Sequence, residues 1–390
     1  MAEVTSRELY ARLARGEPTF LIDVRAPKDF ESWHIDGPGA VDVLNVPFAR
    51  IQADADYLEK SLAGEIPQGP LIVTVCAKGN SSVPVAEELR RLGFTAASLE
   101  GGMRGWGNHY AVVPVVENEA LSILQVSRPA RGCLSWIAIS EGEAVVVDPL
   151  RHVERYLEIL AGRDLRLVAV VDTHGHADHV SGGRRLAEAA AAAYYLHPYD
   201  AIHPIDLVPA AFAYEPLRER QTLAFGSSMM DVLHVPGHTL GACALLVDDR
   251  YVLAGDTLFV GGIARPDLGG HAEAWTPLHQ DSLRRLLALD GETLVLPGHF
   301  SSFAEADASG RFAATIASLR EANEGAKRAA GAPSDFAAYI LASLPAFPPA
   351  YFDIKRVNLG LQAPDEAEAS ELEIGKNACA LATPAPTGTS

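Results

Sequence analysis

The run THGHADHVSGG, residues 173–183, gathers histidine and aspartate side chains immediately after an apolar stretch. Imidazole nitrogens and carboxylate oxygens are ligands for divalent transition metals. Further residues of these two types follow in VPGHT, LAGDT and LPGHF, again after apolar runs. The seven candidate ligands are His174, His176, Asp178, His179, His238, Asp256 and His299. Burying so many polar groups unpaired would be costly, so we predict that they hold a metal ion.

A second candidate site is the thiol of Cys76, in the stretch VCAKGNSS at residues 75–82. A strand-like run, LIVTV, precedes this loop, and a helical pattern follows it. Backbone N–H groups and the positive end of the helix would point at the sulfur and stabilise a thiolate or an anionic persulfide. Lys78 adds positive charge. We therefore predict that Cys76 is reactive and that Lys78 assists it.

Composition limits the number of domains to expect and the classes of molecule that these sites could act on. The 390 residues exceed what one hydrophobic core usually organises, so we expect two domains. A formal net charge of -18 disfavours nucleic acid and anionic membranes as partners and favours small molecules. The N-terminal MAEVTSRELY has no features of a secretory signal, and no apolar run is long enough to span a membrane. Four widely spaced cysteines suit reduced thiols in a cytoplasm.

The elements that must position these residues change character along the chain. Helix-like and strand-like runs alternate up to about residue 110, which indicates a small α/β domain with a parallel sheet. Short strands then dominate, with few helices between them, and indicate an αββα sandwich. We expect a domain at 1–110, a linker at 111–118, the metal domain at 119–310, and a helical and irregular extension at 311–390. Residues 383–390 should be mobile.

HGHADH, together with the later His, Asp and His, resembles the metallo-β-lactamase superfamily over roughly residues 118–303. The resemblance implies that binuclear members would bind one metal through His174, His176 and His238. The second metal would be bound by Asp178, His179 and His299, and Asp256 would bridge the two.

The segments GDTLFVGG and ARPDL resemble the branch that contains glyoxalase II and the persulfide dioxygenases. This resemblance implies a single Fe(II) held by His174, His238 and Asp256, a pattern that leaves open positions for O2 and substrate. The other four residues would then orient the site or hold a second metal. Arg265 is a candidate for binding the substrate. GHF and GGIAR depart from the branch's GHDY and GGCGR.

The first domain resembles a rhodanese through LIDVRAPKDFESWHIDGPGAVDVLNVPF and LEGGMRGW. That family implies that Cys76 accepts a sulfane sulfur and passes it to a thiol. A related phosphatase is disfavoured, because such loops carry an Arg where this chain has Ser82. The loop also lacks the Arg residues common in thiosulfate-using rhodaneses.

Together these features predict an enzyme that oxidises glutathione persulfide, or a similar persulfide, to sulfite with Fe(II) and O2. Sulfur transfer through Cys76 would be coupled to it. Expected partners are the persulfide, thiosulfate or sulfite, and O2, with a homo-oligomer left open. One alternative is a binuclear zinc or iron hydrolase of glutathione thioesters. Another is a non-catalytic sulfur carrier or sensor.

Overall fold

A computed structural model describes residues 3–39, 41–54 and 56–381. The tail at 383–390, expected to be mobile, lies outside the described residues. The chain divides into two compact units. The first holds the described residues up to Ala111 together with Arg128–Arg131 and Ile374–Lys376. The second holds Val112–Ser127, Gly132–Glu373 and the described residues from Asn377 onward.

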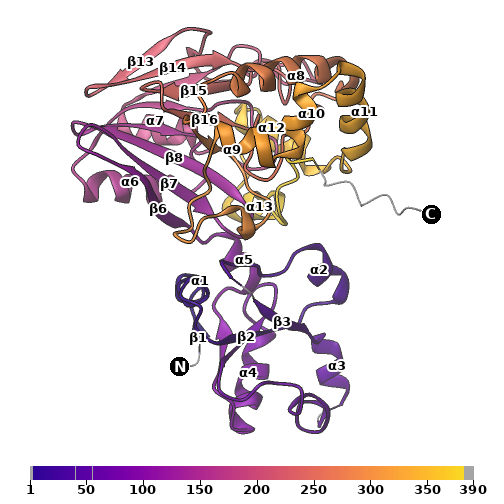
Figure 1. The fold of residues 1–390 in the computed structure, drawn as a ribbon. Helices are drawn as coiled ribbons and strands as arrows, with labels where there is room; N and C mark the ends of the chain where they lie inside the picture. Colours follow the sequence, from indigo (N-terminus) through magenta and orange to yellow (C-terminus); the bar gives the residue numbers. More distant parts are fainter. Residues whose placement is uncertain (1–2, 40, 55, 382–390) are drawn as a thin grey trace. The chain divides into compact units, whose positions relative to one another are not determined.

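The first unit is built on a parallel sheet with strand order β1-β5-β4-β2-β3 (Figure 1). Its described strands are β1 (Glu3–Val4), β2 (Thr19–Asp23), β3 (Asp42–Asn45), β4 (Leu71–Val75) and β5 (Ala96–Leu99). The helices are α1 (Ser6–Ala14), α2 (Pro27–Ser32), α3 (Phe48–Ala53), the π-helical turn η1 (Leu58–Leu62), α4 (Ser82–Arg91) and α5 (Gly102–Gly107).

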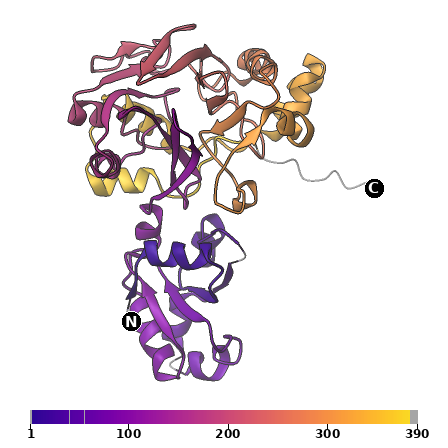
Figure 2. The same ribbon diagram turned by 60° about the vertical axis from the view of Figure 1, so that its left-hand side comes forward.

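Both faces of this sheet are covered, as the two views show (Figures 1 and 2). Alternate residues of β4 point to opposite sides. Val73 lies in one core with Leu9 of α1 and Trp106 of α5, while Ile72 lies in another with Leu89 of α4. The helices therefore fix the end of β4, where the Cys76 loop begins.

The second unit contains two sheets. The first has the order β12-β11-β10-β9-β8-β7-β6 and the second the order β13-β14-β15-β16-β17-β18. The first sheet consists of β6 (Ala111–Glu117), β7 (Ser122–Arg128), β8 (Cys133–Ser140), β9 (Glu143–Val147), β10 (Arg166–Val171), β11 (Ala193–Leu196) and β12 (Glu215–Pro216). The second consists of β13 (Thr222–Phe225), β14 (Ser228–His234), β15 (Cys243–Val247), β16 (Tyr251–Gly255), β17 (Leu294–Pro297) and β18 (Ala314–Thr315).

Helical elements connect or follow the strands of this unit. They are α6 (Val153–Gly162), α7 (Gly183–Ala190), α8 (Ala272–Leu287), the 3-10 turn η2 (Phe303–Glu305), α9 (Ile316–Ala322), α10 (Glu324–Ala330), α11 (Pro333–Ser343), α12 (Ala350–Asn358) and α13 (Glu366–Leu372). Strand β15 shows the layering. Leu245 packs in the core between the sheets, and its neighbour Leu246 packs against the helical side that includes Leu283 of α8. The expected αββα sandwich is confirmed (Figure 1).

Two expectations about local structure differ from the fold. Residues 111–117, expected as linker, form β6 at the edge of a sheet, and their exposure alternates along most of its length. The stretch ADYLEKSLAGEIP, residues 55–67, has a helix-like pattern, but the helical element assigned within its described residues is only the short turn η1. None of the described helices has the length and apolarity needed to cross a membrane.

Candidate metal centre and cysteine loop

The seven candidate ligands lie where strands of the second unit end. The first four follow β10, His238 lies in the turn between β14 and β15, Asp256 follows β16, and His299 comes soon after β17. All seven side chains are buried. The sequence therefore placed them correctly at strand termini, and the fold brings them together.

Three of them form the group that we call the metal triad: His174, His238 and Asp256. The Asp256 Oδ2 atom lies 3.4 Å from His238 Nε2 and 3.7 Å from His174 Nε2. None of these three atoms has a hydrogen-bond partner within the described part of the chain. Buried polar atoms are nearly always paired, so three convergent unpaired donors fit a cation.

Hydrogen bonds orient the triad. His238 Nδ1 donates to the carbonyl oxygen of Arg265 at 2.7 Å. Thr173 Oγ1 donates to Asp148 Oδ2 at 2.8 Å, so its oxygen is free to accept from His174 Nδ1 at 3.0 Å. Both imidazoles thus keep a lone pair on Nε2, the tautomer that binds metals. Burial holds the pKa of His174 well below its ordinary value and also lowers that of His238.

The remaining acidic and basic groups pair with one another. This paired cluster consists of Asp178, His179 and His299. Asp178 accepts from His299 Nε2 at 2.8 Å and from His179 Nδ1 at 3.0 Å, and His299 Nδ1 contacts Asp256 Oδ1 at 2.6 Å. Burial alone would lower the pKa of both imidazoles, but the neighbouring carboxylates raise it by more. The net result is a pKa of about 10 for His179 and a pKa well above the ordinary value for His299. Cys133 Sγ lies 3.5 Å from Asp178 Oδ2.

His176 is not a member of the triad, although its ring centroid lies 4.1 Å from that of His174. Its Nε2 lies 3.1 Å from Asp148, and its Nδ1 has no hydrogen-bond partner among the described residues. Asp200 links the two ligand loops, because it accepts from the backbone N–H groups of Gly175 and Gly241 at 2.7 and 2.9 Å. The sequence analysis did not identify Asp148 or Asp200. Asp148 directly follows β9 and Asp200 comes soon after β11, and these positions near strand ends could have identified both residues as candidates.

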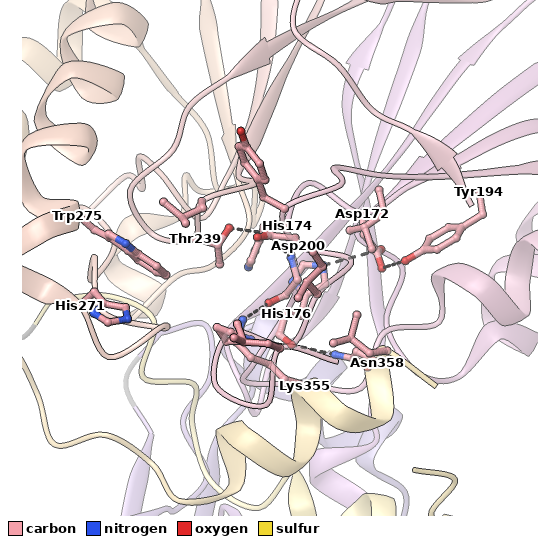
Figure 3. A pocket seen from close by; sticks show the side chains of 18 residues that line it. Asp172, His174, His176, Tyr194, Asp200, Thr239, His271, Trp275, Lys355 and Asn358 are labelled. Carbon is pink, nitrogen blue, oxygen red and sulfur yellow. Dashed lines mark hydrogen bonds and ion pairs between the residues drawn. The ribbon is translucent and has the colours of Figure 1, made fainter. Parts of the chain in front are cut away.

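A cavity of about 280 Å³ opens beside His174, one of the triad residues (Figure 3). His174 and His176 line one part of it, and Tyr194, Trp275 and Lys355 line others. Lys355 is 6% exposed, its Nζ donates to Gly175 O at 2.9 Å, and burial lowers its pKa. The sequence analysis did not identify Lys355, because its contact with residue 175 is long-range.

Arg265, the expected substrate-binding residue, has a different environment. Its guanidinium is completely buried and forms an ion pair with Asp267. It also donates to the carbonyl oxygens of Pro345, Ala346 and Ala378. Arg265 does not line the cavity described above. These contacts indicate that Arg265 supports the C-terminal segments, and its expected contact with substrate stays a prediction.

In the first unit, the Cys76 thiol is 5% exposed and accepts hydrogen bonds from Gly79 N at 3.1 Å and Ser82 Oγ at 3.2 Å. Burial would raise the pKa of this thiol, but these bonds, with the backbone of Lys78, lower it overall. The Lys78 side chain is exposed. Ser82, noted from the sequence as the residue where phosphatases have Arg, therefore contacts the sulfur directly.

The segment GGMRGW, residues 101–106, packs against the backbone of the cysteine loop. Met103 N donates to Cys76 O at 2.8 Å. Gly102 has φ +55°, and an added Cβ would lie 2.1 Å from Cys76 O. The loop can adopt this conformation only because residue 102 has no side chain.

Comparison with known proteins gives two family matches. Residues 128–299 match the metallo-beta-lactamase superfamily, and residues 5–109 match the rhodanese-like domain. An uncharacterized protein of Aquifex aeolicus is 35% identical over 193 residues, which are 46% of this chain and 89% of that protein. A hydroxyacylglutathione hydrolase of Methylococcus capsulatus is 33% identical over 214 residues, 54% of this chain and 73% of that protein.

Among solved structures, a metallo-beta-lactamase from Staphylococcus aureus aligns with a TM-score of 0.53. It is 24% identical, and the alignment covers 62% of this chain and 73% of that chain. At this identity the likeness concerns the fold alone.

Proposed function

The chain belongs to the metallo-β-lactamase superfamily and carries a rhodanese-like domain before that region, and on this premise we propose that it is a persulfide dioxygenase. In the proposed reaction, glutathione persulfide or a similar low-molecular-weight persulfide reacts with O2 and water to give sulfite and the free thiol. Sulfane-sulfur transfer through Cys76 accompanies it.

The metal triad is the observation that carries this proposal. Two imidazoles and one carboxylate converge with unpaired atoms, while the paired cluster satisfies most of its own groups. A 2-His-1-carboxylate set with open positions is typical of non-haem Fe(II) oxygenases. Fe(II) held by His174, His238 and Asp256 would supply the redox chemistry that zinc lacks. One iron per chain is expected.

The surrounding residues would orient the triad and bind the substrate. His299 contacts Asp256 Oδ1 and so directs Oδ2 of the same carboxylate toward the triad imidazoles. Lys355 presents a buried ammonium to the cavity, where it can pair with a substrate carboxylate. Tyr194 and Trp275 contribute aromatic surface that limits water in the cavity. This arrangement suits an anionic thiol carrier such as glutathione.

Cys76 would perform the second half of the chemistry. Its thiolate attacks the sulfane sulfur of a donor such as thiosulfate, which forms a cysteine persulfide and releases sulfite. A thiol then takes the sulfur, and Cys76 returns to the thiolate. The bonds from Gly79 and Ser82 stabilise the negative sulfur at both stages.

The test is oxygen consumption by anaerobically purified, Fe(II)-loaded protein on addition of glutathione persulfide, with sulfite and metal measured on the same sample. We expect Asp256→Ala to abolish oxygen uptake and to leave sulfur transfer intact. Cys76→Ser should have the opposite effect. Loss of both reactions in both folded variants would contradict two separate sites.

A binuclear thioester hydrolase is the second candidate, and a specific observation favours it. The relative named hydroxyacylglutathione hydrolase is 33% identical, and all seven superfamily ligand positions are present here. His299→Ala distinguishes the two functions by degree: it removes a metal ligand in the binuclear case, but only a contact to Asp256 in the single-iron case, where the loss should be more tolerable. Two bound metals with thioester hydrolysis, and no oxygen uptake, would support the hydrolase.

A further inference from the structure

A short segment near the C-terminus, residues 377–381, lies against the metal centre. We call it the closing segment. It pairs with residues 263–265: Ala380 bridges Ala264, Arg265 N donates to Cys379 O at 2.9 Å, and Leu381 N donates to Ile263 O at 3.1 Å. The Arg265 carbonyl in turn accepts from His238. The closing segment is therefore fixed to the same backbone that orients a triad ligand.

Other contacts hold this segment in a buried position. Ala378 N donates to the hydroxyl of Tyr351 at 2.8 Å, and the Arg265 guanidinium donates to Ala378 O. Cys379 packs in a small core with Ala177, which lies between two candidate ligands, and with Phe259 and Leu268. The Cys379 side chain is completely buried. These contacts determine where its sulfur points.

The sulfur of Cys379 lies among metal-ligating atoms. Its Sγ and one ligand atom each from Asp178, Asp256 and His299 all lie within 4.8 Å of one another. Asp256 also belongs to the triad, and its Oδ2 atom has no hydrogen-bond partner in the described chain. The nearest hydroxyl, that of Tyr351, is 3.9 Å from Sγ. Cys379 thus shares Asp256 with the triad, and its other two neighbours in this group belong to the paired cluster.

We propose that Cys379 is a ligand of the metal ion held at Asp256, so that the closing segment contributes a thiolate to the centre. A divalent transition metal would displace the thiol proton to solvent and bind the sulfur, without any redox change. The ligand set then includes a residue about 80 positions beyond the last superfamily histidine. This inference rests on the metal proposed at the triad and is independent of which reaction the enzyme performs.

Other thiols provide matched controls. Cys133 Sγ belongs to a separate group with Asp178, His179 and His299, so it is the competing donor. Cys243 is equally buried, but it lies in β15 among apolar core residues. Cys76 belongs to the other unit.

The test uses metal-free protein titrated with Co²⁺ alone and followed by absorption. We expect a sulfur-to-cobalt charge-transfer band in the near ultraviolet. The band should be lost in Cys379→Ser and retained in Cys133→Ser, Cys243→Ser and Cys76→Ser. The weaker visible bands of bound Co²⁺ should persist in Cys379→Ser, because the triad remains.

Absence of the band in the wild-type protein, or its loss in Cys133→Ser with retention in Cys379→Ser, would overturn the proposal. If Cys379→Ser does not fold, retention of the band in the other three variants still assigns it to Cys379 by elimination. Oxygen uptake does not enter this experiment. A normal cobalt spectrum in a protein without dioxygenase activity would refute the proposed reaction and leave the thiolate ligand standing.

Discussion

Gly237→Ala should loosen the metal centre without removing any candidate ligand. Gly237 precedes His238 and has φ +151°, a conformation that residues with a side chain rarely adopt. An added Cβ would lie 2.5 Å from both Cα and Cβ of His279, which is buried in α8. Neither atom is the end of a flexible side chain, so the turn that carries His238 must move.

The expected cost follows from two contributions. Unfavourable backbone conformation costs about 1–3 kcal/mol, and overpacking of a filled interior costs about 1–3 kcal/mol. We therefore expect a loss of about 2–6 kcal/mol, against a typical total stability of about 5–15 kcal/mol. The variant should fold, but with a displaced ligand. Metal affinity should fall about 10- to 100-fold, as when a supporting residue of a metal site is lost.

Scanning calorimetry is the appropriate stability assay, because the two units need not unfold together. Co²⁺ titration gives the affinity, and sulfur transfer through Cys76 should be unchanged. Gly262→Ala is the matched control, since nothing lies within 4 Å of the Cβ that it adds. Equal stability and equal Co²⁺ affinity in the two variants would refute the reasoning.

Three further outcomes are expected. Ser82→Ala removes a hydrogen bond to the Cys76 sulfur, so the pKa of that thiol should rise and alkylation at pH 7 should slow about tenfold, whereas Ser81→Ala should not change the rate. Lys355→Met should raise KM for glutathione persulfide about tenfold with little change in kcat. The control Lys327→Met, at an exposed position, should change neither constant. Equal KM values in the Lys355→Met variant and the wild-type protein would exclude the carboxylate contact. Burial lowers the pKa of both triad imidazoles, so these rings need lose no proton when Co²⁺ binds. In Cys379→Ser, where no thiol proton is displaced, the affinity for one Co²⁺ should therefore change little between pH 7 and 8. An affinity that still rises steeply with pH in that variant would indicate a second ion that displaces protons from the paired cluster, whose carboxylates raise the pKa of His179 and His299.

The sequence best predicted those site residues whose type suits metal binding and whose position directly follows a strand-like run. His174, His238 and Asp256 each follow an apolar run, and the ends of strands from the two sheets bring these residues together. AEAAAAAYYL was expected to be a helix running into a strand, and the structure has the end of α7 followed by β11. The order of the two domains was also predictable from motifs at their ends.

Tertiary contacts could not be predicted in the same way. Arg265 follows a segment typical of a substrate site, but Asp267 and distant carbonyl groups satisfy it. Lys355 and Cys379 reach the centre through packing of the C-terminal helices and the closing segment. No local periodicity encodes such contacts. The edge strand β6 was missed because a strand with an exposed side resembles a linker in composition.

The position of the closing segment bears on how the protein is made. Donors near the metal centre extend from Cys133, where β8 begins, to Cys379. A nascent chain whose His299 has just emerged from the ribosome would still lack the closing segment that packs beside Asp256. Since domains tend to fold as units and in N-terminal order during synthesis, most of the rhodanese-like unit can reach its structure well before the candidate metal centre is complete. The metal content of a purified sample would then report the fraction of molecules in which the second unit is completely folded.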